Sequence, residues 1–202
     1  MDFEKILLPN HDYNLDVGIV RGVTNSEDLL DKIKGGSLQA YKENDKEIIT
    51  YIILNPECIS SLEQLELTTM IVLDRYQSNT LTTKFGLASE FMSCLDANRS
   101  IKETLKLFGI QSNSKDLLLG FFYKTDTPSN IVSDFTKKIV SEIQFEYSED
   151  ASKVASNLKK NKSCKIKEVY SISDQEIDLN SKDSDHFDSQ MLSSLIRINA
   201  CV

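Results

Sequence analysis

Histidines, cysteines and clustered carboxylates carry most acid–base, nucleophilic and metal chemistry in proteins, and this sequence has them in no recognisable arrangement. His11 and His186 are its two histidines, and both lie in polar stretches without a matched cysteine or serine partner. The four cysteines are widely spaced and form no Cys-x-x-Cys pair: Cys58, Cys94, Cys164 and Cys201. The sequence contains no phosphate loop, dinucleotide-binding fingerprint or nucleophile elbow.

These absences predict a protein that is not an enzyme and that uses no cofactor, no metal and no small-molecule substrate. A small enzyme whose site is assembled from distant residues is an alternative. Such an enzyme would show a deep polar pocket with perturbed carboxylates.

The charge and the cysteine pattern limit the possible partners and compartments. The formal net charge of −8 is unfavourable for non-specific nucleic-acid binding, so any RNA contact must come from a local patch or from partner subunits. No apolar run approaches the ~20 residues of a membrane span, and the N-terminus lacks the basic and apolar regions of a signal peptide. Scattered, unpaired cysteines favour a reducing compartment. We therefore expect a cytoplasmic and nuclear protein with no membrane partner.

The most clearly delimited element is the segment Ser100–Ile110, which has the start and stop signals of a short helix. Ser100 can cap the first turn and Glu103 can reach back to the cap, as in a capping box. Gly109 is predicted to take the left-handed conformation that ends many helices. The apolar residues at helical spacing are Ile101, Leu105 and Phe108. We expect Leu105 to be buried.

The segments on either side, Leu87–Leu95 and Leu117–Tyr123, are apolar and predict two strands that share one core with this helix. The hydrophobic pattern predicts further strands at 17–20 and 48–54. It also predicts four further helices: one at 27–34, one that begins at Ser60 or Ser61 and ends at about Gln77, one at 129–143 and one at 187–200. Residues 1–14 are expected to be loosely ordered, 39–47 to be a loop, and 174–186 to be a mobile acidic loop. The predicted fold is a single α+β or mixed α/β domain over residues 1–202, with a mostly antiparallel or mixed sheet packed by helices, including one at the C-terminus.

Several of these segments resemble the PRPK-binding (TPRKB-like) protein family, the small non-kinase subunits of the KEOPS (EKC) complex. The matching residues in the central region are Leu87, Ser89, Glu90, Phe91–Leu95, Ile101, Leu105, Phe108, Gly109 and Ile110. The Asn55-Pro56 pair before a long apolar helix, the segment Val169–Ser173 and the apolar C-terminal helix match in the same order. The resemblance extends from about Asp16 to the end of the chain.

The resemblance implies a non-catalytic subunit that binds the small atypical kinase of the complex. It also implies help in recruiting tRNA, notably its 3′ CCA end, for threonylcarbamoyladenosine modification. Candidate kinase contacts are Met70 and the C-terminal stripe residues Met191, Leu195 and Ile198. For both helices, burial in the core is the alternative to docking a partner.

Candidate tRNA contacts are Lys84, Arg75 and Arg197. Family members carry a basic cluster just before the Leu-x-Ser-Glu segment, whereas the matching residues here, 82–85, include only one basic residue, Lys84. Lys84 and Arg75 can equally be ordinary solvated charges. A generic protein-interaction domain with no tRNA role is the competing interpretation of the whole chain.

Overall fold

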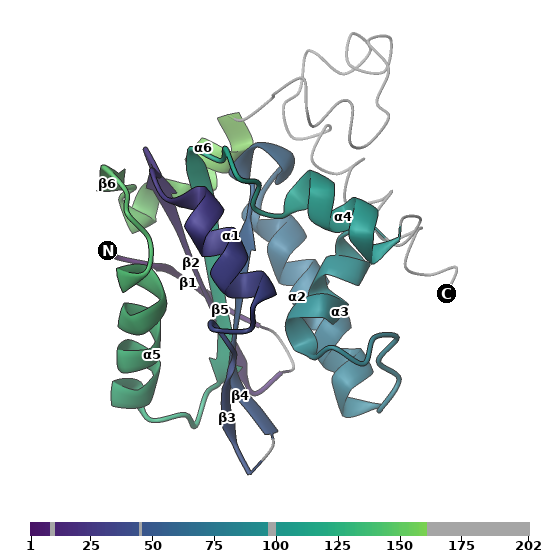
Figure 1. Ribbon diagram of the computed structural model, residues 1–202. Coiled ribbons are helices and arrows are strands. Elements are labelled where there is room, and N and C mark those ends of the chain that lie inside the picture. Colours follow the sequence, from purple (N-terminus) through teal and green to yellow (C-terminus); the bar gives the residue numbers. More distant parts are fainter. Residues whose placement is uncertain (9–10, 45, 97–99, 161–202) are drawn as a thin grey trace, which may run out of the picture.

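One antiparallel sheet runs through the molecule and carries helices on both faces (Figure 1). The computed structural model describes residues 1–8, 11–44, 46–96 and 100–160. Within this part the strand order is β1-β2-β5-β4-β3, and the short β6 pairs with the end of β2. The strands are β1 (Glu4–Leu7), β2 (Tyr13–Arg21), β3 (Tyr41–Glu43), β4 (Lys46–Leu54), β5 (Asp116–Lys124) and β6 (Tyr147–Ser148).

The central strand β5 shows how the sheet divides the molecule into two cores. Its side chains alternate between the faces, so that Leu118 and Phe122 lie in one core and Leu119 and Phe121 in the other. The first core is covered by α2 (Leu62–Gln77), α3 (Leu87–Leu95), α4 (Ile101–Phe108) and α6 (Val154–Lys160), and the second by α1 (Ser26–Lys34) and α5 (Ser129–Ser141). The short 3₁₀ turns η1 (Pro56–Cys58) and η2 (Ala151–Lys153) precede α2 and α6.

This architecture confirms the predicted α+β class with an antiparallel sheet. The strands predicted at 17–20, 48–54 and 117–123 are the cores of β2, β4 and β5, and the helices predicted at 27–34, 61–77 and 129–143 correspond to α1, α2 and α5. The predicted acidic loop at 174–186 and the predicted helix at 187–200 lie outside the described residues.

The prediction of a strand at Leu87–Leu95 is wrong, because this segment is helix α3. Its buried apolar residues Leu87, Phe91 and Leu95 recur every four positions, which places them on one face of a helix. The same segment also contains short apolar runs that resemble a buried strand, and periodicity alone separates these two cases poorly. The local unit is therefore two helices followed by a strand.

Two segments that were expected to be irregular form edge strands. Part of the N-terminal segment is β1, which pairs with β2 from Glu4 opposite Val17 to Leu7 opposite Asn14. Part of 39–47 is β3, which forms a hairpin with β4. Both are short, and their sequences are too polar to produce a strand pattern, so the pairing with a long apolar neighbour determines their conformation.

Helix α4 begins as predicted but ends differently. The capping box is present, because Glu103 N–H donates to Ser100 Oγ at 3.4 Å and Ser100 N–H donates to Glu103 Oε2 at 3.0 Å. Gly109 is extended, with φ −80°, and pairs with Leu54 at the end of β4, so the predicted left-handed ending is wrong. Leu105 is 47% exposed, and its predicted burial is also wrong.

Candidate functional site

The connection between α2 and α3, residues 78–86, is hereafter the α2–α3 loop, and it carries the candidate site. Helix α2 is capped at its start by Ser61, whose Oγ accepts a hydrogen bond from Gln64 N–H at 3.3 Å. At its end, Ser78 N–H donates to Asp74 O at 3.0 Å and Thr80 N–H donates to Arg75 O at 2.8 Å. These bonds fix the direction in which the loop leaves the helix.

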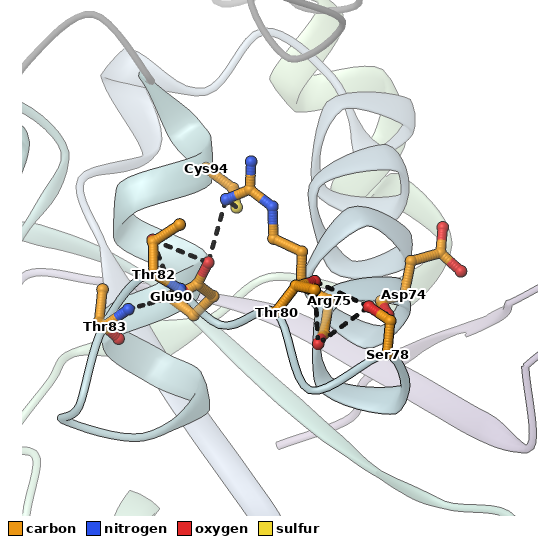
Figure 2. A network of polar contacts seen from close by, with 8 residues as sticks. All are labelled: Asp74, Arg75, Ser78, Thr80, Thr82, Thr83, Glu90 and Cys94. Carbon is orange, nitrogen blue, oxygen red and sulfur yellow. Dashed lines mark hydrogen bonds and ion pairs between the residues drawn. The ribbon is translucent and has the colours of Figure 1, made fainter. Parts of the chain in front are cut away.

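A fully buried carboxylate, Glu90 on α3, holds the middle of the loop (Figure 2). Its oxygens accept hydrogen bonds from Thr82 N–H and Thr83 N–H, both at 2.9 Å, and from Thr82 Oγ1 at 3.0 Å. The guanidinium of Arg75 on α2 donates to the same carboxylate at 3.0 Å. Glu90 therefore ties two helices and the loop together through charge-assisted hydrogen bonds.

The hydrogen bonds of Glu90 outweigh the cost of its burial. Burial alone would raise the pKa of the carboxyl group, because it disfavours the charged form. The amides of Thr83 and Thr82 and the Arg75 guanidinium stabilise the charged form, and the net effect is a pKa below the ordinary value for glutamate. Glu90 is therefore ionised at neutral pH.

The lowered pKa of Glu90 predicts a component of acid destabilisation. A carboxyl group whose pKa is lower in the folded state than in the unfolded state, where it is about 4.3, adds stability above that pH. This stability is lost as the pH falls through the folded-state pKa. We expect the free energy of unfolding of Glu90→Gln to fall less than that of the wild type between pH 7 and pH 3.5, as measured by urea unfolding. Parallel pH profiles for the two proteins would contradict the assignment.

Arg75 faces the interior of this helix pair. Its guanidinium also donates to Cys94 Sγ at 3.2 Å, and its side chain is 16% exposed. Burial raises the pKa of the Cys94 thiol to about 11, even though the guanidinium acts in the opposite direction. The thiol is therefore protonated at neutral pH and unreactive as a nucleophile. In this arrangement Arg75 serves as the counter-ion of a buried carboxylate.

The last part of the loop presents two adjacent side chains to solvent. Lys84 is exposed, and Phe85 is 81% exposed, which is high for a large aromatic residue. The next residue, Gly86, has φ 91° and ψ 179°, a conformation that is essentially restricted to glycine. Glu47 Oε2, from β4, then accepts a hydrogen bond from Leu87 N–H at 3.0 Å. The tip is thus held from both sides, by Glu90 and by Glu47.

Only part of the predicted site falls on the described residues. Lys84 lies at the exposed tip, Arg75 lies in the internal network, and Met70 is a half-buried residue of α2 that packs against the first core. The other predicted kinase and tRNA contacts lie outside the described residues: Met191, Leu195, Ile198 and Arg197.

The exposure of Phe85 was not predicted from the sequence. The available signal was an aromatic residue between Lys84 and Gly86 in an otherwise polar stretch. That signal is weak, because the side chain of a single aromatic residue in a loop is usually buried beneath the loop.

A hollow lies on the opposite helical layer, between α5 and the connection from α1 to β3. Its volume is about 740 Å³, and its lining contains Lys42, Lys138 and Asp134 but no histidine or cysteine. In the described part of the chain, no three histidine, cysteine or acidic side chains are grouped as metal ligands would be. None of the described helices is long and apolar enough to cross a membrane.

The fold is a small α+β domain, and its α2–α3 loop is held by hydrogen bonds to Glu90 and Glu47. The sequence matches the family described as Kinase binding protein CGI-121 over residues 20–196. This match covers most of the chain, and the protein belongs to that family, which confirms the resemblance drawn from its sequence. Among curated proteins, none matches this chain. Membership of a kinase-binding family makes a protein kinase its expected partner.

Proposed function

We propose that this protein is a non-catalytic subunit of the KEOPS (EKC) complex that binds the small atypical kinase of that complex. We further propose that it helps recruit tRNA, through the 3′ CCA end, for threonylcarbamoyladenosine modification. The observation that carries the proposal is the kinase-binding family match over residues 20–196. On this proposal the protein supplies binding energy, its partners supply the chemistry, and both the cytoplasm and the nucleus are its compartments.

The proposed kinase-docking surface consists of Met70 on α2 and the C-terminal stripe residues Met191, Leu195 and Ile198. Met70 supports it, because this side chain is only half buried although it belongs to a helix that covers the first core. An interface of standard size would bury ~1,600 Å² in total, so several such apolar side chains are needed.

The proposed RNA contact uses the tip of the α2–α3 loop, with Arg197 as a further contact. Lys84 is exposed there and can pair with a phosphate, whereas the guanidinium of Arg75 already pairs with Glu90. We therefore give Arg75 a role in positioning the loop rather than in direct contact. A generic protein-interaction domain is the second candidate, and the net charge of −8 favours it over RNA recruitment by the isolated chain.

The docking surface is tested by placing a carboxylate within it. We expect Met70→Glu and Leu195→Glu each to weaken binding to the kinase by at least tenfold, because a charge would be buried at an apolar contact. The measurement is isothermal titration of the purified kinase into each variant, with circular dichroism to verify folding.

Lys137→Glu, on the exposed face of α5, is the matched control and should bind like the wild type. If both test variants fold and bind the kinase with wild-type affinity, the docking assignment is wrong. If the Leu195→Glu variant does not fold, the Leu195 side chain belongs to the core, and this result would likewise contradict the docking assignment.

A further inference from the structure

We propose that the outer edge of β3 binds an extended, acidic segment of a partner protein as an added strand, with one apolar side chain of that segment in the hollow beside α5. This surface lies on the face of the sheet opposite to α2, which carries Met70 (Figure 1). The inference is therefore independent of the kinase and RNA contacts proposed above.

Strand β3 is an edge of the sheet, because within the described part of the chain it pairs with β4 alone. The main-chain N–H and C=O groups that point away from β4 can therefore pair with an incoming extended segment. The hairpin of β3 and β4 projects beyond the ends of α1 and α5 at the bottom of Figure 1, and Lys42 and Glu43 are exposed. The edge is thus accessible to a partner.

The edge needs a second contact to bind a segment selectively. Its three residues form a short ladder, and the charged side chains of Lys42 and Glu43 restrict indiscriminate pairing. The hollow adjoins β3 directly, because its lining includes Ala40 and Tyr41. Since side chains alternate between the faces of a sheet, a strand paired with β3 would direct every second side chain towards the α5 face.

The floor of the hollow is apolar and well packed. Phe135 of α5 is 6% exposed, and its ring packs against those of Tyr41, Tyr51 and Phe121, with centroids 6.2, 6.3 and 6.4 Å away. Ile131, one turn earlier on α5, is half-buried and lines the same hollow. The volume of about 740 Å³ is ample for an aromatic or branched aliphatic side chain.

The opposite wall of the hollow, residues 36–40, is held in place by hydrogen bonds. Tyr51 OH donates to Leu38 O at 2.9 Å, which ties this wall to the floor. Gln39 Nε2 donates to Gly36 O, also at 2.9 Å. The hollow is therefore formed before a ligand arrives, and little conformational entropy of the wall is lost on binding.

The charges at the rim favour an acidic segment. The exposed charged residues of the lining are Lys42, Lys138 and Asp134. Among the described residues, Lys138 has no ion-pair partner, and the contact of Lys42 with Glu47 is long, at 3.9 Å, and largely solvated. The rim thus has an excess of one positive charge in a chain whose net charge is −8. Carboxylates beside the apolar side chain would be attracted, whereas a second copy of this chain would be repelled by its own net charge.

The first experiment selects ligands for the full-length chain from random peptides displayed on phage. We expect the enriched sequences to share an aromatic or branched aliphatic residue with carboxylates on either side. The most enriched peptide is then synthesised with a fluorescent label, and its affinity is measured by anisotropy. Two further forms carry N-methyl groups on its odd or its even residues. Because an added strand directs alternate N–H groups towards its neighbour, one form should lose binding and the other should retain it.

The second experiment locates the peptide on the protein. Ile131→Glu should weaken peptide binding by at least tenfold, because it places a charge within the apolar hollow. Lys138→Glu should weaken binding severalfold and reduce its dependence on salt. Lys137→Glu, beside Lys138 on α5 but outside the hollow, is the matched control and should bind like the wild type. Circular dichroism verifies folding, and all three variants should bind the kinase like the wild type.

The remaining outcomes would overturn the inference. If no common sequence is enriched, or if both N-methylated forms bind like the unmodified peptide, no strand is added at β3. Wild-type peptide affinity in Lys138→Glu and in folded Ile131→Glu would show that the hollow is not used. A dimer in light scattering that Ile131→Glu abolishes would make a second copy the occupant. If Ile131→Glu and Lys138→Glu both lose the kinase, this surface belongs to the kinase interface, and the proposed function stands without the inference.

Discussion

Replacing Glu90 by alanine should lower the free energy of unfolding by about 3 kcal/mol, the lower end of the range for breaking a buried ion pair. The substitution would leave the amides of Thr82 and Thr83 without their acceptor and the Arg75 guanidinium without its counter-ion. The lower end applies because the Arg75 side chain is 16% exposed, so water can hydrogen-bond to its guanidinium when Glu90 is removed. Urea unfolding at pH 7 measures the effect.

A double-mutant cycle separates the interaction energy between Glu90 and Arg75 from the effect of lost side-chain packing. Arg75→Ala in the Glu90→Ala background should cost less than Arg75→Ala in the wild type, by more than about 1 kcal/mol, because the partner is already absent. Asp134→Ala, an exposed carboxylate on α5, is the control and should change stability by less than about 0.5 kcal/mol. Additive effects of the two network substitutions would show that Glu90 and Arg75 act independently.

Replacing Phe108 by alanine should cost about 3–5 kcal/mol, the range for a large aromatic side chain in a packed core. Phe108 is fully buried on α4, in the same core as Leu118 and Phe122 of β5. Because the carbonyl of Phe108 also accepts a hydrogen bond from Asn55 N–H at 2.7 Å, the surrounding backbone cannot easily move into the cavity.

Leu105→Ala on the same helix is the matched control. The side chain of Leu105 is 47% exposed, so its loss should cost less than about 1 kcal/mol. Similar costs for the two variants in urea unfolding would show that the burial assigned to α4 is wrong.

The sequence predicted those elements whose local pattern and tertiary environment agree. Strands β2, β4 and β5 are long and apolar, and α2 and α5 have clear starts and apolar faces, so each could be located within a few residues. Helix α3 was misread because its apolar run fits both a buried strand and a helix. The edge strands β1 and β3 have no pattern of their own and depend on their neighbours in the sheet.

The site was less predictable, because its properties arise from contacts between distant segments. Lys84 was identified from its position before the Leu-x-Ser-Glu segment, and it is indeed exposed. The inward direction of Arg75 depends on Glu90, a residue of another helix that only the fold brings near. Glu47 contacts the end of the loop from the hairpin of β3 and β4, where its carboxylate accepts a hydrogen bond from Leu87 N–H, so no local motif could associate it with this segment.

The network gives a structural role to Glu90, the glutamate of the Ser-Glu pair in the segment that resembles the family. Glu90 stabilises the backbone conformation of the loop, because it accepts hydrogen bonds from Thr82 and Thr83 of the loop and from Arg75 of α2 (Figure 2).

The most direct test of the proposed function is binding between this chain and the small atypical kinase of its own organism. The two proteins are expressed together and separated by size-exclusion chromatography with light scattering to determine the mass. We expect one species with the mass of a one-to-one complex. Two separate peaks, with each protein folded and free, would contradict the assignment of this chain as the kinase-binding subunit of that complex.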